Sequence, residues 1–197
     1  MKLRFLVPAL ALALTTIAAH AQIGIYFNPV VSRISNSKAD TGPFAFLGDG
    51  KTAQTFGGVD FGAYYDFAHY SKADLGVDVR DAIQHGNSAS FNSFLVGVRL
   101  AAKPMAFNLK PYVQVSVGEG RTKAPLSSAH IQRLQFGVFV GLDKPLNKHV
   151  DWRIVEISYG TVSTINSTNF LANTTTPTSF PEAQVLGFST GFVFRFK

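Results

Sequence analysis

The side chains best suited to chemistry are charged residues that recur at alternate positions inside otherwise apolar segments. An isolated charge in a dry protein interior is very costly, so charges that share such an interior should form pairs. We interpret the set in two ways: as a salt-bridge network that fills an interior, or as a narrow polar path for water or small ions. The set comprises Asp60, Asp66, Asp78, Arg80, Arg99, Arg133, Glu156 and Arg195.

Histidine is the residue used most often for acid–base catalysis, and four histidines follow position 21. None of them begins a His-x-Ser pair. A serine–histidine pair would require a tertiary contact, for example between His130 and Ser127 or Ser128. We interpret the histidines as exposed residues of loops and turns, and we predict no catalytic residue. The four are His69, His85, His130 and His149.

Several other classes of chemistry find no support in the composition. The chain contains no cysteine, which excludes disulfides, thiolate metal sites and cysteine nucleophiles. Its acidic residues lack calcium-loop spacing, and no glycine-rich phosphate loop occurs. We therefore expect no metal and no cofactor. The formal charge of +6 is mild and comes without a basic run, so we expect no nucleic-acid partner.

The elements that must position the charged residues show an alternation with a period of two. In residues 59–67 every odd position is apolar, and similar alternation recurs in 75–80, 94–100, 113–118 and 134–142. A strand places alternate side chains on opposite faces, whereas a helix cannot place such a set on one side. The pattern therefore predicts an all-β chain.

Eight strands are predicted, and their length favours a membrane protein. Each is 11 to 14 residues long. A strand of a soluble protein usually has about 5 to 6 residues, whereas a tilted membrane-spanning strand needs about 9 to 11. After residue 21 no apolar stretch is long enough for a transmembrane helix. The predicted spans are 22–33, 54–67, 73–83, 91–103, 110–121, 131–143, 150–161 and 184–196.

The two faces of these strands differ in a way that predicts an eight-stranded antiparallel up-and-down transmembrane β-barrel. One face carries large apolar residues, which suit lipid, and the other carries glycine, serine, glutamine and charge, which suit a narrow interior. We assign a lipid-facing set and an aromatic set near the strand ends. The lipid-facing set is Val59, Phe61, Val77, Val79, Val96, Val98, Val113, Val115, Phe136, Val138, Val155, Ile157, Phe188 and Phe192. The aromatic set is Tyr65, Phe67, Trp152, Tyr159, Phe194 and Phe196, and the parity of Trp152 places it inside unless a bulge shifts it.

The two ends of the chain and its connections predict export and orientation. Residues 1–21 read as a cleaved secretory signal peptide, with Lys2 and Arg4 before an apolar run and an Ala-His-Ala cleavage site at its end. Residues 22–197 then form the barrel domain. The predicted connections 34–53 and 162–183 are long, whereas 68–72, 104–109 and 144–149 are short. Since outer-membrane barrels have short periplasmic turns, we expect the long connections to face outward.

The C-terminal segment resembles the terminal strand of bacterial outer-membrane barrels, in which alternating aromatic residues lead to a terminal aromatic. Here Phe192, Phe194 and Phe196 alternate and Lys197 follows. Residues 22–197 as a whole resemble the small porin-family barrels related to the transmembrane domain of outer-membrane protein A. The resemblance implies an outer-membrane location, insertion by the barrel-assembly machinery, contact with lipids including lipopolysaccharide, and a monomer. Relatives that deacylate lipid A carry a His-x-Ser pair, which this sequence lacks.

These observations lead to one leading functional hypothesis and two alternatives. The leading hypothesis is a non-enzymatic barrel that contributes to envelope integrity or surface interaction through its outer loops, with an interior closed by ion pairs. The alternatives are a small pore or carrier for a small solute, and a lipid A-modifying enzyme. Within the interior we predict Glu156 within salt-bridge distance of Arg80 or Arg99, because its strand faces theirs across a narrow lumen.

Overall fold

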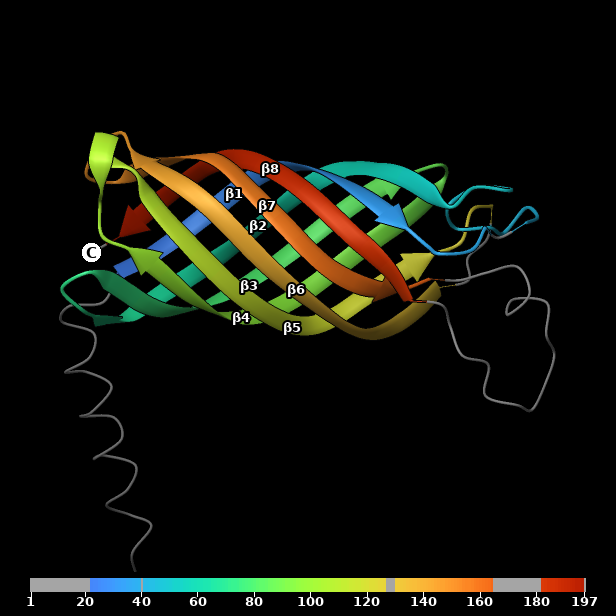
Figure 1. The fold of residues 1–197 in the computed structure, drawn as a ribbon, viewed down its shortest axis with the longest axis horizontal. Helices are drawn as coiled ribbons and strands as arrows, with labels where there is room; N and C mark the ends of the chain where they lie inside the picture. Colours follow the sequence, from blue (N-terminus) through green and yellow to red (C-terminus); the bar gives the residue numbers. More distant parts are fainter. Residues whose placement is uncertain (1–21, 40, 127–129, 165–181, 197) are drawn as a thin grey trace, which may run out of the picture.

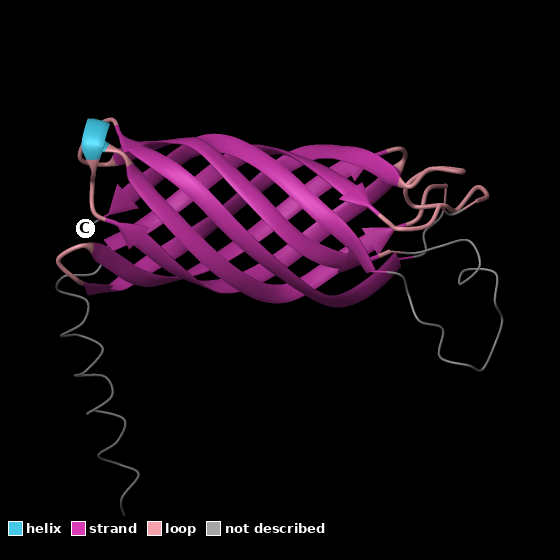
Figure 2. Cartoon of the chain, in the orientation of Figure 1, coloured by secondary structure: helices cyan, strands magenta, loops and turns pink. Residues whose placement is uncertain are grey.

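The computed structural model describes residues 22–39, 41–126, 130–164 and 182–196, and these form one closed barrel (Figures 1 and 2). Each strand pairs antiparallel with its sequence neighbours, and β1 pairs with β8 to close the ring. The predicted eight-stranded up-and-down barrel is therefore confirmed. The strands are β1 (Gln22–Ser35), β2 (Ala53–His69), β3 (Ala73–Gly86), β4 (Ala89–Ala102), β5 (Lys110–Lys123), β6 (His130–Pro145), β7 (Val150–Ser163) and β8 (Glu182–Phe196).

The connections differ at the two ends of the barrel. At one end lie the β1–β2, β3–β4 and β5–β6 connections, and at the other lie the C-terminus and the short turns, one with the 3-10 helix η2 (Ala106–Asn108) (Figure 1). The connection between the predicted strands 73–83 and 91–103 is shorter in the structure: only Asn87 and Ser88 separate β3 from β4, with φ of 50° and 57°. Two consecutive left-handed residues are typical of a tight hairpin turn, so both strands extend to it. Most of the predicted connection 162–183 lies outside the described residues.

The outer surface of the barrel carries the predicted apolar face. Every residue of the predicted lipid-facing set lies on that face; all are exposed except Val59, which is half-buried. The predicted aromatic set lies on the same face, with Tyr65 half-buried and the others exposed. In water such a continuous apolar belt would be unstable, whereas against acyl chains it is the favoured surface. Among the described residues, no helix is long and apolar enough to cross a membrane.

A β-bulge in β7 changes which side chains of this strand face the interior. Arg153 pairs with Gly191 while Glu156 pairs with Ser189, so β7 advances three residues where β8 advances two. On the N-terminal side of the bulge the odd-numbered side chains of β7 face inward, and on its C-terminal side the even-numbered side chains do. Trp152 is consequently exposed on the outer surface and Arg153 is buried. The Thr190 hydroxyl donates to the Arg153 carbonyl at 2.8 Å, which satisfies one backbone group at the irregular site.

The neighbouring residues Gly57 and Gly58 of β2 provide a test of this packing. A Cβ at Gly58 would lie 1.9 Å from the Ile83 carbonyl oxygen, whereas a Cβ at Gly57 would have no heavy atom within 4 Å. We expect Gly58→Ala to lower the free energy of unfolding by about 1 to 3 kcal/mol, because the backbone must shift to admit the methyl group. Gly57→Ala is the matched control. Equal midpoints for the two variants in urea titrations of the folded barrel in detergent would contradict the register.

Candidate functional site

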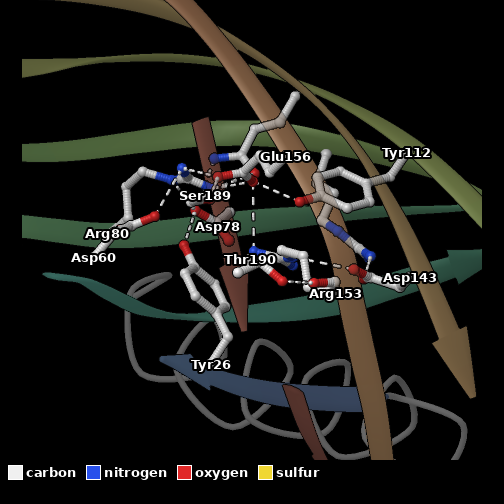
Figure 3. A network of polar contacts seen from close by, with 12 residues as sticks. Tyr26, Asp60, Asp78, Arg80, Tyr112, Asp143, Arg153, Glu156, Ser189 and Thr190 are labelled. Atoms are coloured by element: carbon white, nitrogen blue, oxygen red, sulfur yellow. Dashed lines mark hydrogen bonds and ion pairs between the residues drawn. The ribbon is translucent and has the colours of Figure 1, made fainter. Parts of the chain in front are cut away.

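The centre of the barrel interior is built around the guanidinium group of Arg80, on β3 (Figure 3). Arg80 Nη1 lies 3.3 Å from Asp60 Oδ2, and Arg80 Nε lies 3.4 Å from Asp78 Oδ1. The guanidinium carbon also lies 3.7 Å from the centroid of the Phe139 ring. The group is thus held by charge and by an aromatic face, and Arg80 is only 2% exposed.

Glu156, on β7, forms the strongest contact with this centre. Its Oε1 lies 3.1 Å from Arg80 Nη1 and its Oε2 lies 3.1 Å from Arg80 Nη2, which is a bidentate pair. The Tyr112 hydroxyl donates to Oε2, and the Ser189 hydroxyl donates to Oε1 at 3.2 Å. Arg153 Nη1 adds a further contact at 3.4 Å. The predicted proximity of Glu156 to Arg80 is confirmed, and we call Asp60, Asp78, Arg80 and Glu156 the central network.

Neutral donors complete the central network. Among the described residues, six carboxylates and four guanidinium groups are buried, so ion pairs alone leave carboxylate oxygens to be satisfied. Asp78 Oδ1 accepts from the Tyr26 hydroxyl at 3.0 Å and from the Gln114 amide at 2.7 Å. Asp78 is therefore satisfied by one guanidinium group and two neutral donors, and it needs no second cation.

A second layer, which we call the lower network, lies between the central network and the end of the barrel that carries the short turns (Figure 1). The predicted orientation makes this the periplasmic end and makes the end with the β1–β2 connection the outer end. Arg99 Nη1 lies 3.2 Å from both carboxylate oxygens of Asp66, and Arg99 Nη2 lies 3.5 Å from Asp143 Oδ2. Arg153 Nε donates to Asp143 Oδ1 at 3.0 Å. The guanidinium carbon of Arg99 lies 4.0 Å from the Tyr64 ring centroid. Cations and aromatic rings therefore alternate through this part of the lumen.

The periplasmic end of the interior holds one more cluster. Arg195 Nη2 lies 2.7 Å from Asp151 Oδ1, and Lys110 Nζ lies 3.3 Å from Asp151 Oδ2. Outside this cluster, Asp74 contacts both His69 at 2.6 Å and Lys103 at 2.5 Å, in the short-turn region. The lumen is thus crossed by paired charges from its midpoint to its periplasmic end.

The outer end of the lumen is closed by apolar side chains instead of charges. Phe46 and Leu47 of the β1–β2 connection are buried against residues of the strands, and the rings of Phe46 and Phe56 stack with centroids 5.0 Å apart. Phe46 is 1% exposed. We call this cluster the apolar mouth. It consists of Ile34, Phe46, Leu47, Phe56, Ala89, Phe91, Val162, Ala183 and Val185.

A small cavity separates the apolar mouth from the central network. Its volume is about 40 Å³, and its lining includes Asp60, Arg80 and Glu156 on one side and Phe91 and Val185 on the other. By volume it holds about two or three water molecules. Asp60 Oδ1 is buried without a protein partner, and water in this cavity would satisfy it.

The structure places most of the predicted interior charges together and corrects one of them. Asp60, Asp78, Arg80, Arg99, Glu156 and Arg195 are buried in the lumen. Arg133 is exposed, contrary to the prediction. In the described residues the pairing of β6 with β7 stops at Phe136, while its pairing with β5 continues to His130. Gln135, the next inward-facing residue, is still buried, whereas Arg133 lies two residues farther from the last position that pairs with β7.

Three buried charged residues were missed: Asp143, Asp151 and Arg153. Asp143 and Asp151 lie at the periplasmic ends of their predicted strands, where a turn position was equally consistent with their type. Strict alternation counted from Glu156 would place Arg153 on the outer face. Charges at 151 and 153 but also at 156 conflict with strict alternation, and that conflict was the available signal of a bulge.

The four histidines lie at or near the ends of the barrel, in β2, β3, β6 and the β6–β7 turn. All four are exposed at the ends of strands or in turns. The possible partners of His130, Ser127 and Ser128, lie outside the described residues. The described residues also contain no group of three or more histidines and acids that would hold a metal ion.

Comparisons with known proteins agree with this geometry. No protein-family model and no curated protein matches the chain. The solved structure of Neisserial surface protein A superposes with a TM-score of 0.61 at 13% identity, covering 88% of this chain and 97% of that one. The attachment invasion locus protein Ail of Yersinia pestis superposes with a TM-score of 0.50 at 11% identity, covering 89% and 97%. Ail in complex with the heparin analogue sucrose octasulfate gives 0.51 at 12%, covering 89% and 99%.

The fold is that of the small bacterial outer-membrane β-barrels. At these sequence identities the similarity concerns the fold alone. Independent evidence for a membrane protein comes from the apolar belt on the outer surface of this barrel. The fold and the apolar belt together place the protein in the bacterial outer membrane, with its strands across the bilayer.

Proposed function

We propose that this outer-membrane barrel is a non-enzymatic component of the envelope that contributes to envelope integrity or surface interaction through its outer loops. The observation that carries the proposal is the closed lumen. Ion pairs fill its central and periplasmic parts, and the apolar mouth covers its outer part. A rigid closed barrel presents its loops and its outer surface to other molecules rather than conducting solute.

The loops of such a barrel are the natural place for contact with other surfaces. The β1–β2 connection is the longest that the structure describes, and its Phe46 and Leu47 anchor it to the barrel. A loop anchored in this way presents a defined surface. One solved neighbour is an attachment invasion locus protein, a name that belongs to that protein and agrees with this part of the proposal.

The proposal includes the partners that the sequence suggested. The terminal strand with Phe192, Phe194 and Phe196 would be recognised by the barrel-assembly machinery during insertion, and these rings lie on the outer surface as part of β8. Outer-membrane lipids, including lipopolysaccharide, would surround the folded monomer. No cofactor is required for any of these roles.

Planar-bilayer recording tests the closed lumen. We expect the purified barrel to give no stable multi-ion current, because the central network and the apolar mouth each block the lumen. The double variant Phe46→Ala with Glu156→Gln removes a ring of the mouth and the bidentate partner of Arg80, and it should still give no stable current, since the lower network continues to cross the lumen. Stable current from the unaltered barrel would contradict the proposal and favour the alternative of a small pore.

Mass spectrometry of lipid A tests the non-enzymatic part. We expect the lipid A of cells that express the barrel to match that of cells that lack it. A change in acyl-chain number that depends on expression would establish a lipid-modifying enzyme, and would contradict this part of the proposal.

A further inference from the structure

The outward face of three neighbouring strands changes character near the outer end of the barrel. On β5 the outward residues Val113, Val115 and Val117 are followed by Glu119, Arg121 and Lys123. On β4 the side chains that face away from the barrel are apolar up to Phe94, and Asn92 and Ser90 follow toward the outer end of the strand. Those of β6 are apolar up to Leu134, and Gln132 and His130 follow. The apolar belt therefore ends on all three strands where polar and basic side chains begin.

The strand register brings these basic side chains together. Arg121 pairs with Asn92 on one side and with Gln132 on the other, and Lys123 pairs with Ser90 and His130. Ser90, Asn92, Arg121, Lys123 and His130 line a surface hollow of about 350 Å³. We call Arg121, Lys123 and His130 the outer-rim basic cluster.

We propose that the outer-rim basic cluster binds the phosphate group of a phosphorylated lipid in the outer leaflet. Phosphate suits this donor set, because the guanidinium fork of Arg121 can bind two oxygens and Lys123 adds a point charge. The Ser90 hydroxyl and the Asn92 amide supply neutral hydrogen-bond groups in the same hollow. Glu119 lies on the same face two residues from Arg121, nearer the apolar belt, and reduces the positive charge without cancelling it.

The direction of the side chains indicates a lipid and not a soluble anion. They project outward from the walls of strands, and they do not project from loop tips above the rim. The molecules that lie beside the wall at this height are the lipids whose acyl chains contact Phe94, Val117 and Leu134 directly below. A headgroup continuous with those chains would reach the hollow, so one lipid can satisfy both surfaces. This inference rests on the proposed function, in which outer-membrane lipids surround the barrel, and on the predicted orientation, in which the long connections face outward.

Native mass spectrometry of the complete barrel, released from lipid nanodiscs, tests the proposal. The probes are diphosphorylated lipid A and its dephosphorylated form, each doped into phosphatidylcholine. We expect the barrel to retain the diphosphorylated probe, and the double variant Arg121→Gln with Lys123→Gln to retain about tenfold less, because two charge-assisted contacts are lost. The control Lys144→Gln with Lys148→Gln removes two exposed lysines at the opposite end and should retain as much as the unaltered barrel.

Each other outcome bears on the proposal. Equal retention by the two double variants, or equal retention of the two lipid probes, would overturn it. Sucrose octasulfate serves as a soluble polyanionic probe. If the double variant Arg121→Gln with Lys123→Gln binds this probe more weakly than the unaltered barrel but retains lipid equally well, the cluster recognises a soluble polyanion and the proposal is overturned. Displacement of the lipid by millimolar inorganic phosphate alone would show that the acyl chains do not contribute, and this would overturn the proposal that the occupant is a lipid. A faster-migrating unheated band on gels confirms that each variant is folded, and bilayer recording reports separately on the closed lumen.

Discussion

Glu156→Gln should lower the free energy of unfolding by about 3 to 5 kcal/mol. The substitution preserves shape but removes the negative charge that pairs with Arg80 through two contacts of 3.1 Å. Arg80 is 2% exposed, so its charge cannot turn to solvent, and the single contacts with Asp60 and Asp78 that remain, at 3.3 and 3.4 Å, do not replace the lost bidentate partner of a buried charge. Arg153 loses a partner as well. Urea titration in detergent, followed by the fluorescence of Trp152, the single tryptophan, measures the change.

The matched control for this result is Glu119→Gln. Glu119 is exposed on the outer surface of β5 at the height of Leu134, where its carboxylate reaches the headgroup region, so its removal should change stability by no more than about 0.5 kcal/mol. If Glu156→Gln and Glu119→Gln unfold at the same urea concentration, the central network does not stabilise the barrel as described.

Val138→Arg should cost about 2 to 4 kcal/mol of stability in a lipid bilayer. Val138 lies near the middle of β6 on the outer face, at 42% exposure, so an arginine there would project into acyl chains. The cost of arginine on the lipid face depends on depth and is largest at the bilayer midplane. Folding equilibria of the two proteins in phosphatidylcholine vesicles measure the difference.

Leu134→Arg provides the depth control for this substitution. Leu134 lies on the same face of the same strand but only four residues from its outer end at His130, and it is 63% exposed. We expect a cost of at most about 1 kcal/mol, because an arginine at this height reaches the headgroups. A cost at Leu134 as large as that at Val138 would place the belt elsewhere along the strands.

The fold was predictable because alternation is a local property of the sequence. Each run of residues specifies its two faces without reference to any other run, and lipid outside reinforces the pattern on every strand. The pair of Glu156 and Arg80 was predictable for a related reason. Parity directs both side chains inward, and a lumen formed by eight strands is narrow enough for them to meet.

The features that could not be predicted depend on irregularities or on distant contacts. The bulge in β7 inserts a residue between Arg153 and Glu156, and parity carried past it gives the wrong face for Trp152 and Arg153. The burial of Phe46 and Leu47 depends on the path of a long connection, which no periodicity encodes. The apolar run around them, in a connection otherwise rich in polar residues, was the signal that went unused.

The cavity of about 40 Å³ lies between two closures of different chemistry, one apolar and one ionic. Two independent closures in series make the barrel tolerant of failure at either one. A rearrangement of the β1–β2 connection would open the cavity to the outer side alone, because the ion pairs below it would still cross the lumen. The loops could therefore rearrange around another molecule while the ionic part of the lumen stays closed.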